Sequence, residues 1–367
     1  MVRCDCTEEA GMGHKMIEKT RKRIAIRADG NSSLGMGHLM RCLSIAKAAG
    51  KKAECVFLVS ENEAGNFIKE KGFNCHVLGT DYRQMNEELP LVEELYRKYE
   101  ISLLLVDSYQ CTQEYLDAWL QYCPVYRMDD TGESHLQSTG LINYNIYAKE
   151  LNYPVWVKEN MQLVLGAEYA PVKEPFLQTT YVVREQAKRI MITMGGSDTL
   201  NIAGNLCEKL LQTLDKQEEF IIICGRFNPY MEKLLQLQRQ EARVKVLVDV
   251  PDMWNRMAEA DIVISAAGST MYELSAMGVP AVCCYYVENQ RRIAEGFARN
   301  VGIENAGNYA ESADEVLNTI VREVCQLMES YEKRLRLSKQ MKMVTDGRGA
   351  ERIVNKLLGN EIKQASN

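Results

Sequence analysis

Short apolar runs alternate with longer amphipathic stretches along most of the chain, beginning at Arg23. The apolar runs are typical of strands that are buried on both faces of a parallel sheet. We predict strands over 23–29, 54–60, 76–79, 102–108, 125–130 and 141–145, and again over 189–195, 219–225, 244–250, 261–267 and 281–286. Helical patterns separate them, among them 37–48, 91–99, 201–214, 251–260, 270–277 and 289–300. Alternation of strand and helix predicts right-handed βαβ units, so the sequence indicates a doubly wound α/β fold that occurs twice.

The regular pattern breaks near Pro171 and Pro175, which predicts the boundary between the two halves. We expect five segments: a poorly structured N-terminal extension (1–22), a first α/β domain (23–170), a linker (171–188), a second α/β domain (189–345) and a C-terminal helical tail (346–367). Within the extension, 11–14 nearly repeats the Gly-Met-Gly-His of 35–38. Because no strand precedes this copy, we interpret it as coincidental.

Composition narrows the classes of function. The 367 residues are 46% apolar and 26% charged, as in ordinary globular proteins, and the net charge of −6 argues against a nucleic-acid partner. Apolar runs fall well short of the roughly 20 residues that cross a bilayer, and no hydrophobic signal segment is evident, so we expect a cytoplasmic protein without a membrane partner. The twelve cysteines lack paired C-x2-C spacing, so we interpret them as reduced thiols and expect no metal site.

A glycine-rich loop follows the first predicted strand, where doubly wound folds bind their ligands. Gly35 and Gly37 allow the backbone to approach a ligand closely, and the helix that follows presents free amides to an anion. The positive end of that helix disfavours a protonated imidazole, so we expect His38 to be neutral and able to accept a proton. The spacing matches neither a Walker loop nor G-x-G-x-x-G, which argues against an NAD enzyme. The structural alternative is a glycine turn with a capping histidine.

Three further loops follow strands of the second half. Gly195, Gly196 and Ser197 predict a turn that cradles phosphate, although a plain turn is the alternative. A second loop contains small and hydroxyl residues, namely Gly268, Ser269 and Thr270. Glu273, on the first turn of the next helix, is suited to accept the two hydroxyls of a ribose, with a simple dipole partner as the alternative. The last loop directs the amides of Asn289 and Gln290 toward the same crevice.

In this order the loops resemble those of the UDP-sugar hydrolases of the pseudaminic acid pathway. These hydrolases belong to the GT-B superfamily, with the peptidoglycan N-acetylglucosaminyltransferase. The resemblance covers about 23–310. In the first half it is carried by Gly35-x-Gly37-His38-x-x-Arg41 and by segments 107–109, 129–130 and 143–149; in the second half it is carried by 195–198, 268–273 and 289–290.

The resemblance implies a GT-B fold, with two Rossmann-like domains facing a central cleft. The second domain would hold UDP without metal or cofactor. Glycines and hydroxyls of the loops at 195–197 and 268–270 would bind the pyrophosphate. Glu273 would bind the ribose, and segments 225–227 and 248–250 would lie near the uracil. His38 would activate water for an inverting attack on the anomeric carbon of a deoxy-diacetamido sugar, releasing UDP. Further implied catalytic residues are Tyr109 and Asp129. Further implied substrate-binding residues are Asp29, Gly35, Gly37, Arg41, Asp130, Asn145, Asn289 and Gln290.

Other interpretations of these residues remain open. A GT-B transferase would give the sugar to an acceptor hydroxyl instead of water, and a non-catalytic subunit would only present the UDP-sugar to a partner, such as another enzyme of the same pathway. Asp129 and Asp130 could form a polar strand end with a helix cap. Tyr109 could be a half-buried loop aromatic, and Asp29 and Arg41 could form a structural ion pair.

Overall fold

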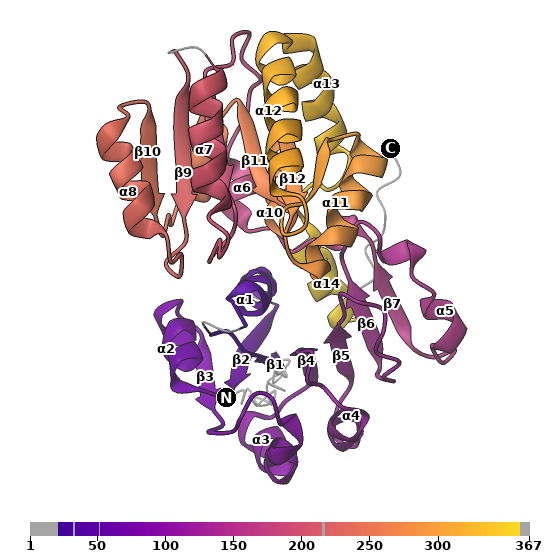
Figure 1. Ribbon diagram of the computed structural model, residues 1–367. Helices are drawn as coiled ribbons and strands as arrows, with labels where there is room; N and C mark the ends of the chain where they lie inside the picture. The colour runs from indigo at the N-terminus through magenta and orange to yellow at the C-terminus, as the bar shows by residue number, and fades with distance from the viewer. Residues whose placement is uncertain (1–20, 32–33, 51, 215–216, 360–367) are drawn as a thin grey trace, which may run out of the picture.

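The computed structural model describes residues 21–31, 34–50, 52–214 and 217–359. The expectations for 1–20, including the repeated Gly-Met-Gly-His, and for the last residues of the predicted tail lie outside this range. The described chain forms two parallel sheets, one in each half (Figure 1).

The first domain is a seven-stranded parallel sheet in the order β3-β2-β1-β4-β5-β6-β7. Its strands are β1 (Lys22–Ala28), β2 (Ala53–Val59), β3 (Asn74–Val77), β4 (Leu103–Asp107), β5 (Val125–Met128), β6 (Gly140–Asn143) and β7 (Gln162–Leu165). Its α-helices are α1 (Gly37–Ala49), α2 (Asn62–Glu70), α3 (Val92–Tyr99), α4 (Gln113–Leu120) and α5 (Tyr153–Trp156), and its 3-10 helices are η1 (Met85–Leu91), η2 (Ala148–Glu150) and η3 (Ala167–Tyr169). Residues Ile24–Ala28 of β1 are completely buried, as expected for a central strand covered on both faces.

The second domain is a six-stranded parallel sheet in the order β10-β9-β8-β11-β12-β13. Its strands are β8 (Arg189–Thr193), β9 (Glu219–Cys224), β10 (Val244–Val248), β11 (Ile262–Ala266), β12 (Ala281–Tyr285) and β13 (Asn305–Asn308). Its helices are α7 (Ile202–Thr213), α8 (Met231–Gln240), α9 (Met253–Glu259), α10 (Thr270–Met277), α11 (Glu288–Val301), α12 (Ala313–Glu329) and α13 (Tyr331–Lys342). The doubly wound fold that the sequence predicts in each half is therefore confirmed.

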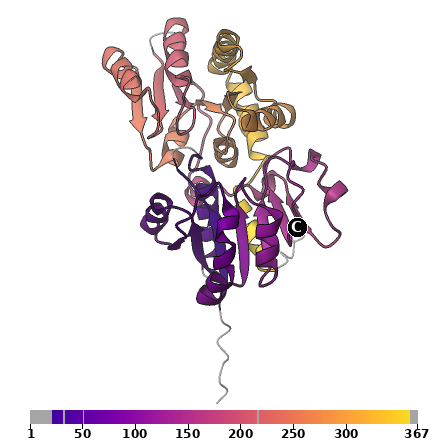
Figure 2. The same ribbon diagram turned by 60° about the horizontal axis from the view of Figure 1, so that its bottom comes forward.

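The predicted linker and the predicted C-terminal tail each contain a helix. The linker contains α6 (Glu174–Gln178), which packs against α10 and buries Phe176. The last helix of the described part, α14 (Gly349–Leu357), returns to the first domain (Figure 2), where it packs against α1. Gly349 permits this return, because a Cβ there would overlap the backbone of Ala170.

Two expectations about the whole chain can be compared with the described residues. None of the helices in the described part is long and apolar enough to cross a membrane. The cysteines in this part are all free, and most of them are buried.

Candidate functional site

A cleft of about 600 Å³ lies between the two domains. The first domain contributes the loop after β1 and the start of α1, including Gly35, Gly37 and Arg41. The second domain contributes loops that follow β8, β9, β10, β11 and β12. The cleft therefore lies at the carboxyl ends of the strands, where doubly wound folds bind ligands.

Most of the predicted nucleotide-binding residues line this cleft. They are Gly195, Gly196, Ser197, Ser269, Thr270, Glu273 and Gln290, and Gly268 directly precedes Ser269 in the same loop. The segments expected near the uracil also contribute, through Gly225, Arg226, Phe227 and Asp249.

Two glycines shape the loop after β8. Gly195 has φ +82°, which glycine adopts without strain. Gly225 lies so close to the neighbouring loop that a Cβ would overlap the carbonyl group of Gly196. Asp198 then fixes the loop to α7, because its carboxylate accepts the backbone N–H groups of Ile202 and Ala203 at 2.8 and 3.0 Å. Burial raises the pKa of Asp198 to about 6, although the two N–H donors act in the opposite direction.

Glu273 is a half-buried carboxylate in the wall of the cleft. Burial raises its pKa, and the positive charge of Lys173 from the linker partly lowers it again. Within the described part of the chain, no hydrogen bond or ion pair of Glu273 is found. Its oxygens are thus available as acceptors for a ligand in the cleft.

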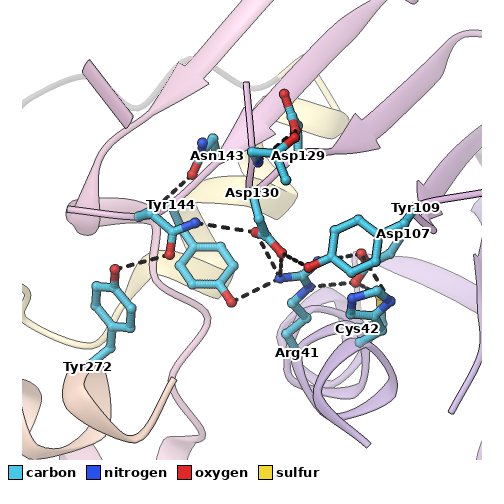
Figure 3. A network of polar contacts seen from close by, with 12 residues as sticks. Arg41, Cys42, Asp107, Tyr109, Asp129, Asp130, Asn143, Tyr144 and Tyr272 are labelled. Atoms are coloured by element: carbon cyan, nitrogen blue, oxygen red, sulfur yellow. Dashed lines mark hydrogen bonds and ion pairs between the residues drawn. The ribbon is translucent and has the colours of Figure 1, made fainter. Parts of the chain in front are cut away.

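Arg41 is the centre of a polar network on the first-domain side (Figure 3). Its Nε donates to Asp107 Oδ2 at 2.6 Å, and its Nη1 donates to Asp130 at 2.9 Å and to the Tyr144 hydroxyl at 3.2 Å. Burial raises the pKa of Asp107, but the charge of Arg41, together with His38, outweighs it and leaves that pKa at about 2. Asp107 is therefore ionised at neutral pH.

Asp130 connects this network to two further predicted residues. It accepts the Tyr109 hydroxyl at 2.8 Å and the Asn145 side-chain amide at 3.3 Å. Burial, then the negative charge of Asp130, raises the pKa of Tyr109, so the phenol remains protonated and acts as a donor.

His38 lies beside Asp107 and Tyr109. Its Nδ1 is 3.9 Å from Asp107 Oδ1, and its ring meets the Tyr109 ring edge-on with centroids 4.8 Å apart. The imidazole is 15% exposed. The structure thus gives His38 a carboxylate neighbour that would stabilise positive charge on the ring.

Asp129 and Asp29 have structural partners instead. Asp129 Oδ1 accepts backbone N–H groups of Thr131 and Gly132, and Oδ2 accepts the Tyr153 hydroxyl at 3.0 Å. This geometry favours the interpretation of Asp129 as a turn-forming residue. Asp29 pairs with Arg27 and accepts the Ser60 amide at 2.8 Å.

The ion pair between Asp29 and Arg41 that the sequence suggested as an alternative is therefore wrong. Arg41 pairs with Asp107, the last residue of β4, and with Asp130, which follows β5. Asp29 is only two residues from Arg27 on the chain, and that nearer cation neutralises it.

A side pocket of about 550 Å³ opens next to the network. Tyr109, Asp129 and Asn289 line it, whereas Gln290 lines the cleft. These two adjacent residues, which the sequence predicted in a loop, lie in the first turn of α11 and line different cavities. Tyr109 lines the side pocket and donates to Asp130, which accepts Arg41 of the cleft wall, so the network connects the linings of the two cavities.

Sequence reasoning did not identify Lys173, Tyr144 or Tyr272, which also line the cleft. The tyrosines stand at positions that are typical of core aromatics, and Lys173 comes from the linker. The signal available for Tyr272 was its place directly before Glu273.

Comparison with known proteins identifies the architecture. The model of the glycosyltransferase family 28 C-terminal domain matches residues 189–353. MurG from Acinetobacter baumannii superimposes with a TM-score of 0.65 and 13% sequence identity, covering 92% of this chain and 99% of MurG. The chain has a GT-B fold. The GT-B arrangement that the resemblance implied is thereby confirmed.

Two curated relatives extend along most of this GT-B chain. The spore coat polysaccharide biosynthesis protein SpsG of Bacillus subtilis is 26% identical over 341 residues, which is 90% of this chain and 96% of SpsG. The UDP-2,4-diacetamido-2,4,6-trideoxy-beta-L-altropyranose hydrolase of Campylobacter jejuni is 27% identical over 281 residues, 76% of this chain and 96% of the hydrolase.

Proposed function

We propose that this protein hydrolyses a UDP-linked deoxy-diacetamido sugar in nonulosonic (pseudaminic) acid biosynthesis, inverting the anomeric carbon and releasing UDP. The observation that carries the proposal is His38 beside Asp107 and Tyr109, on the same helix as Arg41 in the cleft wall. The similarity to the Campylobacter jejuni hydrolase supports the choice of reaction and substrate class.

The second domain would hold the nucleotide. Its diphosphate would lie against the loops at 195–197 and 268–270, where backbone amides, hydroxyls and the start of α10 would neutralise its charge. The unpartnered oxygens of Glu273 would accept the ribose hydroxyls. We place the sugar toward Tyr109 and Asn289 in the side pocket.

The reaction needs a base and a leaving group. His38 would take a proton from water as the water oxygen forms a bond to the anomeric carbon on the face opposite the diphosphate. The bond from that carbon to the diphosphate oxygen breaks, and UDP leaves with the electron pair. Asp107 would stabilise the imidazolium, and Arg41 holds Asp107 in place.

A glycosyltransferase is the second candidate, favoured by the family 28 match over 189–353. Incubation with UDP-sugars in the absence of an acceptor separates the candidates. A hydrolase releases UDP and a sugar of inverted anomeric configuration, which NMR detects before mutarotation. UDP release that requires an acceptor would identify a transferase, and binding without turnover would identify a presenting subunit.

A further inference from the structure

Tyr272 joins the two domains by hydrogen bonds. Its hydroxyl accepts the backbone N–H of Ile146 at 3.0 Å and donates to Asn145 Oδ1 at 3.2 Å, both in the segment after β6. The side chain is 2% exposed, and its ring packs edge-on against Tyr144 and Phe297. Packing from both domains therefore fixes the direction of the hydroxyl.

Asn145 extends this connection to the polar network. Its Nδ2 donates to Asp130 Oδ1 at 3.3 Å, and Asp130 in turn holds Arg41 and the Tyr109 hydroxyl (Figure 3). Asn145 is 3% exposed, so water does not readily replace its partners. A continuous path of hydrogen bonds thus runs from α10 of the second domain to α1 of the first.

The other end of the path lies in the nucleotide cleft. α10 begins at Thr270, and Tyr272 stands in its first turn directly before Glu273. Thr270, Tyr272 and Glu273 all line the cleft. A ligand that binds Thr270 and Glu273 would hold the turn that carries the Tyr272 hydroxyl.

We infer that Tyr272 is a positioning residue, which couples occupancy of the nucleotide cleft to the placement of Asp130 and Arg41. The inference rests on the proposed function, because it takes UDP as the occupant. The hydroxyl of Tyr272 is the essential group, since the ring alone cannot orient Asn145.

The test is Tyr272→Phe, which removes the hydroxyl and keeps the ring. We expect kcat to fall about 10- to 100-fold, as misplaced catalytic groups do, whereas the calorimetric Kd for UDP should change less than about threefold. Asn145→Ala should lower kcat similarly, and the double variant should be no worse than the poorer single variant. Tyr309→Phe is the matched control: Tyr309 is a buried tyrosine of the same domain whose hydroxyl accepts Asn205 Nδ2 at 2.9 Å, and its removal should preserve kcat.

Hydrogen exchange of the Ile146 amide reports on the hydrogen bond to Tyr272 independently of turnover. UDP should slow this exchange in the wild type and fail to slow it in Tyr272→Phe. Unchanged kcat together with retained UDP-dependent protection in the variant would overturn the coupling alone. A wild-type protein that does not bind UDP would overturn the coupling and the proposed function together.

Discussion

Arg41 and Asp107 meet in a two-pronged ion pair that joins α1 to the end of β4. Nε donates to Oδ2 at 2.6 Å and Nη2 to Oδ1 at 2.5 Å, and Asp107 is 1% exposed. His38 lies three residues before Arg41 on the same helix, so this pair also fixes the imidazole relative to the carboxylate. Removing Arg41 would leave Asp107 buried without its main counter-charge, whereas removing Asp107 would leave Arg41 paired with Asp130 alone.

The ion pair of Asp107 makes the free energy of unfolding depend on pH. Its pKa of about 2 lies below the ordinary value of 3.8, so its contribution is complete above pH 4 and is lost as the pH falls toward 2. The wild type should lose about 1 kcal/mol from this group between pH 5 and pH 3. Urea unfolding of the wild type and of Asp107→Asn at both pH values measures the difference.

The partly exposed carboxylate of Asp81, paired with the exposed Arg83 at 2.9 Å, provides the control. Because solvent screens that pair, Asp81→Asn should keep the acid dependence of the wild type. Equal acid dependence in Asp107→Asn and the wild type would show that the buried pair does not have the assigned effect.

Alanine substitutions at two glycines of the cleft, Gly37 and Gly225, should have opposite effects on stability. A Cβ on Gly37 meets no atom within 4 Å, and alanine restricts the unfolded chain more than glycine does, an effect of about 0.4–1 kcal/mol. Gly37→Ala should therefore fold at least as stably as the wild type while raising KM for the UDP-sugar, if ligand approaches this backbone. Gly225→Ala should lower both thermal stability and UDP affinity, because its methyl group would displace the Gly196 loop. Unchanged KM in Gly37→Ala would mean that no ligand approaches there.

Most strands could be predicted from the sequence because buried parallel strands leave continuous apolar runs. The sequence analysis missed β7 and β13, which are four residues long and lie at the outer edges of their sheets. Residues Asn305–Asn308 contain no β-branched or aromatic side chain, so they carry no local strand signal.

The site was predictable where backbone chemistry defines it, as in the glycine and hydroxyl loops. The partners of Arg41 were not, because Asp107 and Asp130 lie 66 and 89 residues away and only the sheet order brings them to α1. The same holds for Tyr272 and Asn145, which are 127 residues apart and belong to different domains.

Glu273→Ala should weaken binding of UDP more than binding of pyrophosphate, which has no ribose. The loss of a charged acceptor corresponds to about 1.5–3 kcal/mol. Calorimetry with both ligands measures the difference. Glu273→Gln retains one acceptor oxygen, so its affinity for UDP should lie between those of the wild type and Glu273→Ala. Equal weakening of both ligands would assign Glu273 to the charge balance of α10 rather than to the ribose.

UDP should bind equally well in EDTA and in Mg²⁺. Residues 195–197, Ser269 and Thr270 line the cleft, and their amides and hydroxyls would neutralise the diphosphate. Calorimetry in both buffers is the measurement. A requirement for Mg²⁺ would contradict neutralisation by amides alone.

His38→Asn tests the base directly. Asparagine keeps a polar side chain but cannot take the proton from water, so turnover should fall about 10²–10⁴-fold. UDP affinity should stay within about threefold, because the nucleotide would lie on the second domain. Near-normal hydrolysis by this variant would leave His38 with a packing role beside Asp107 and Tyr109 only. The base would then be sought at Asp129 or Asp130, because Tyr109 keeps its proton.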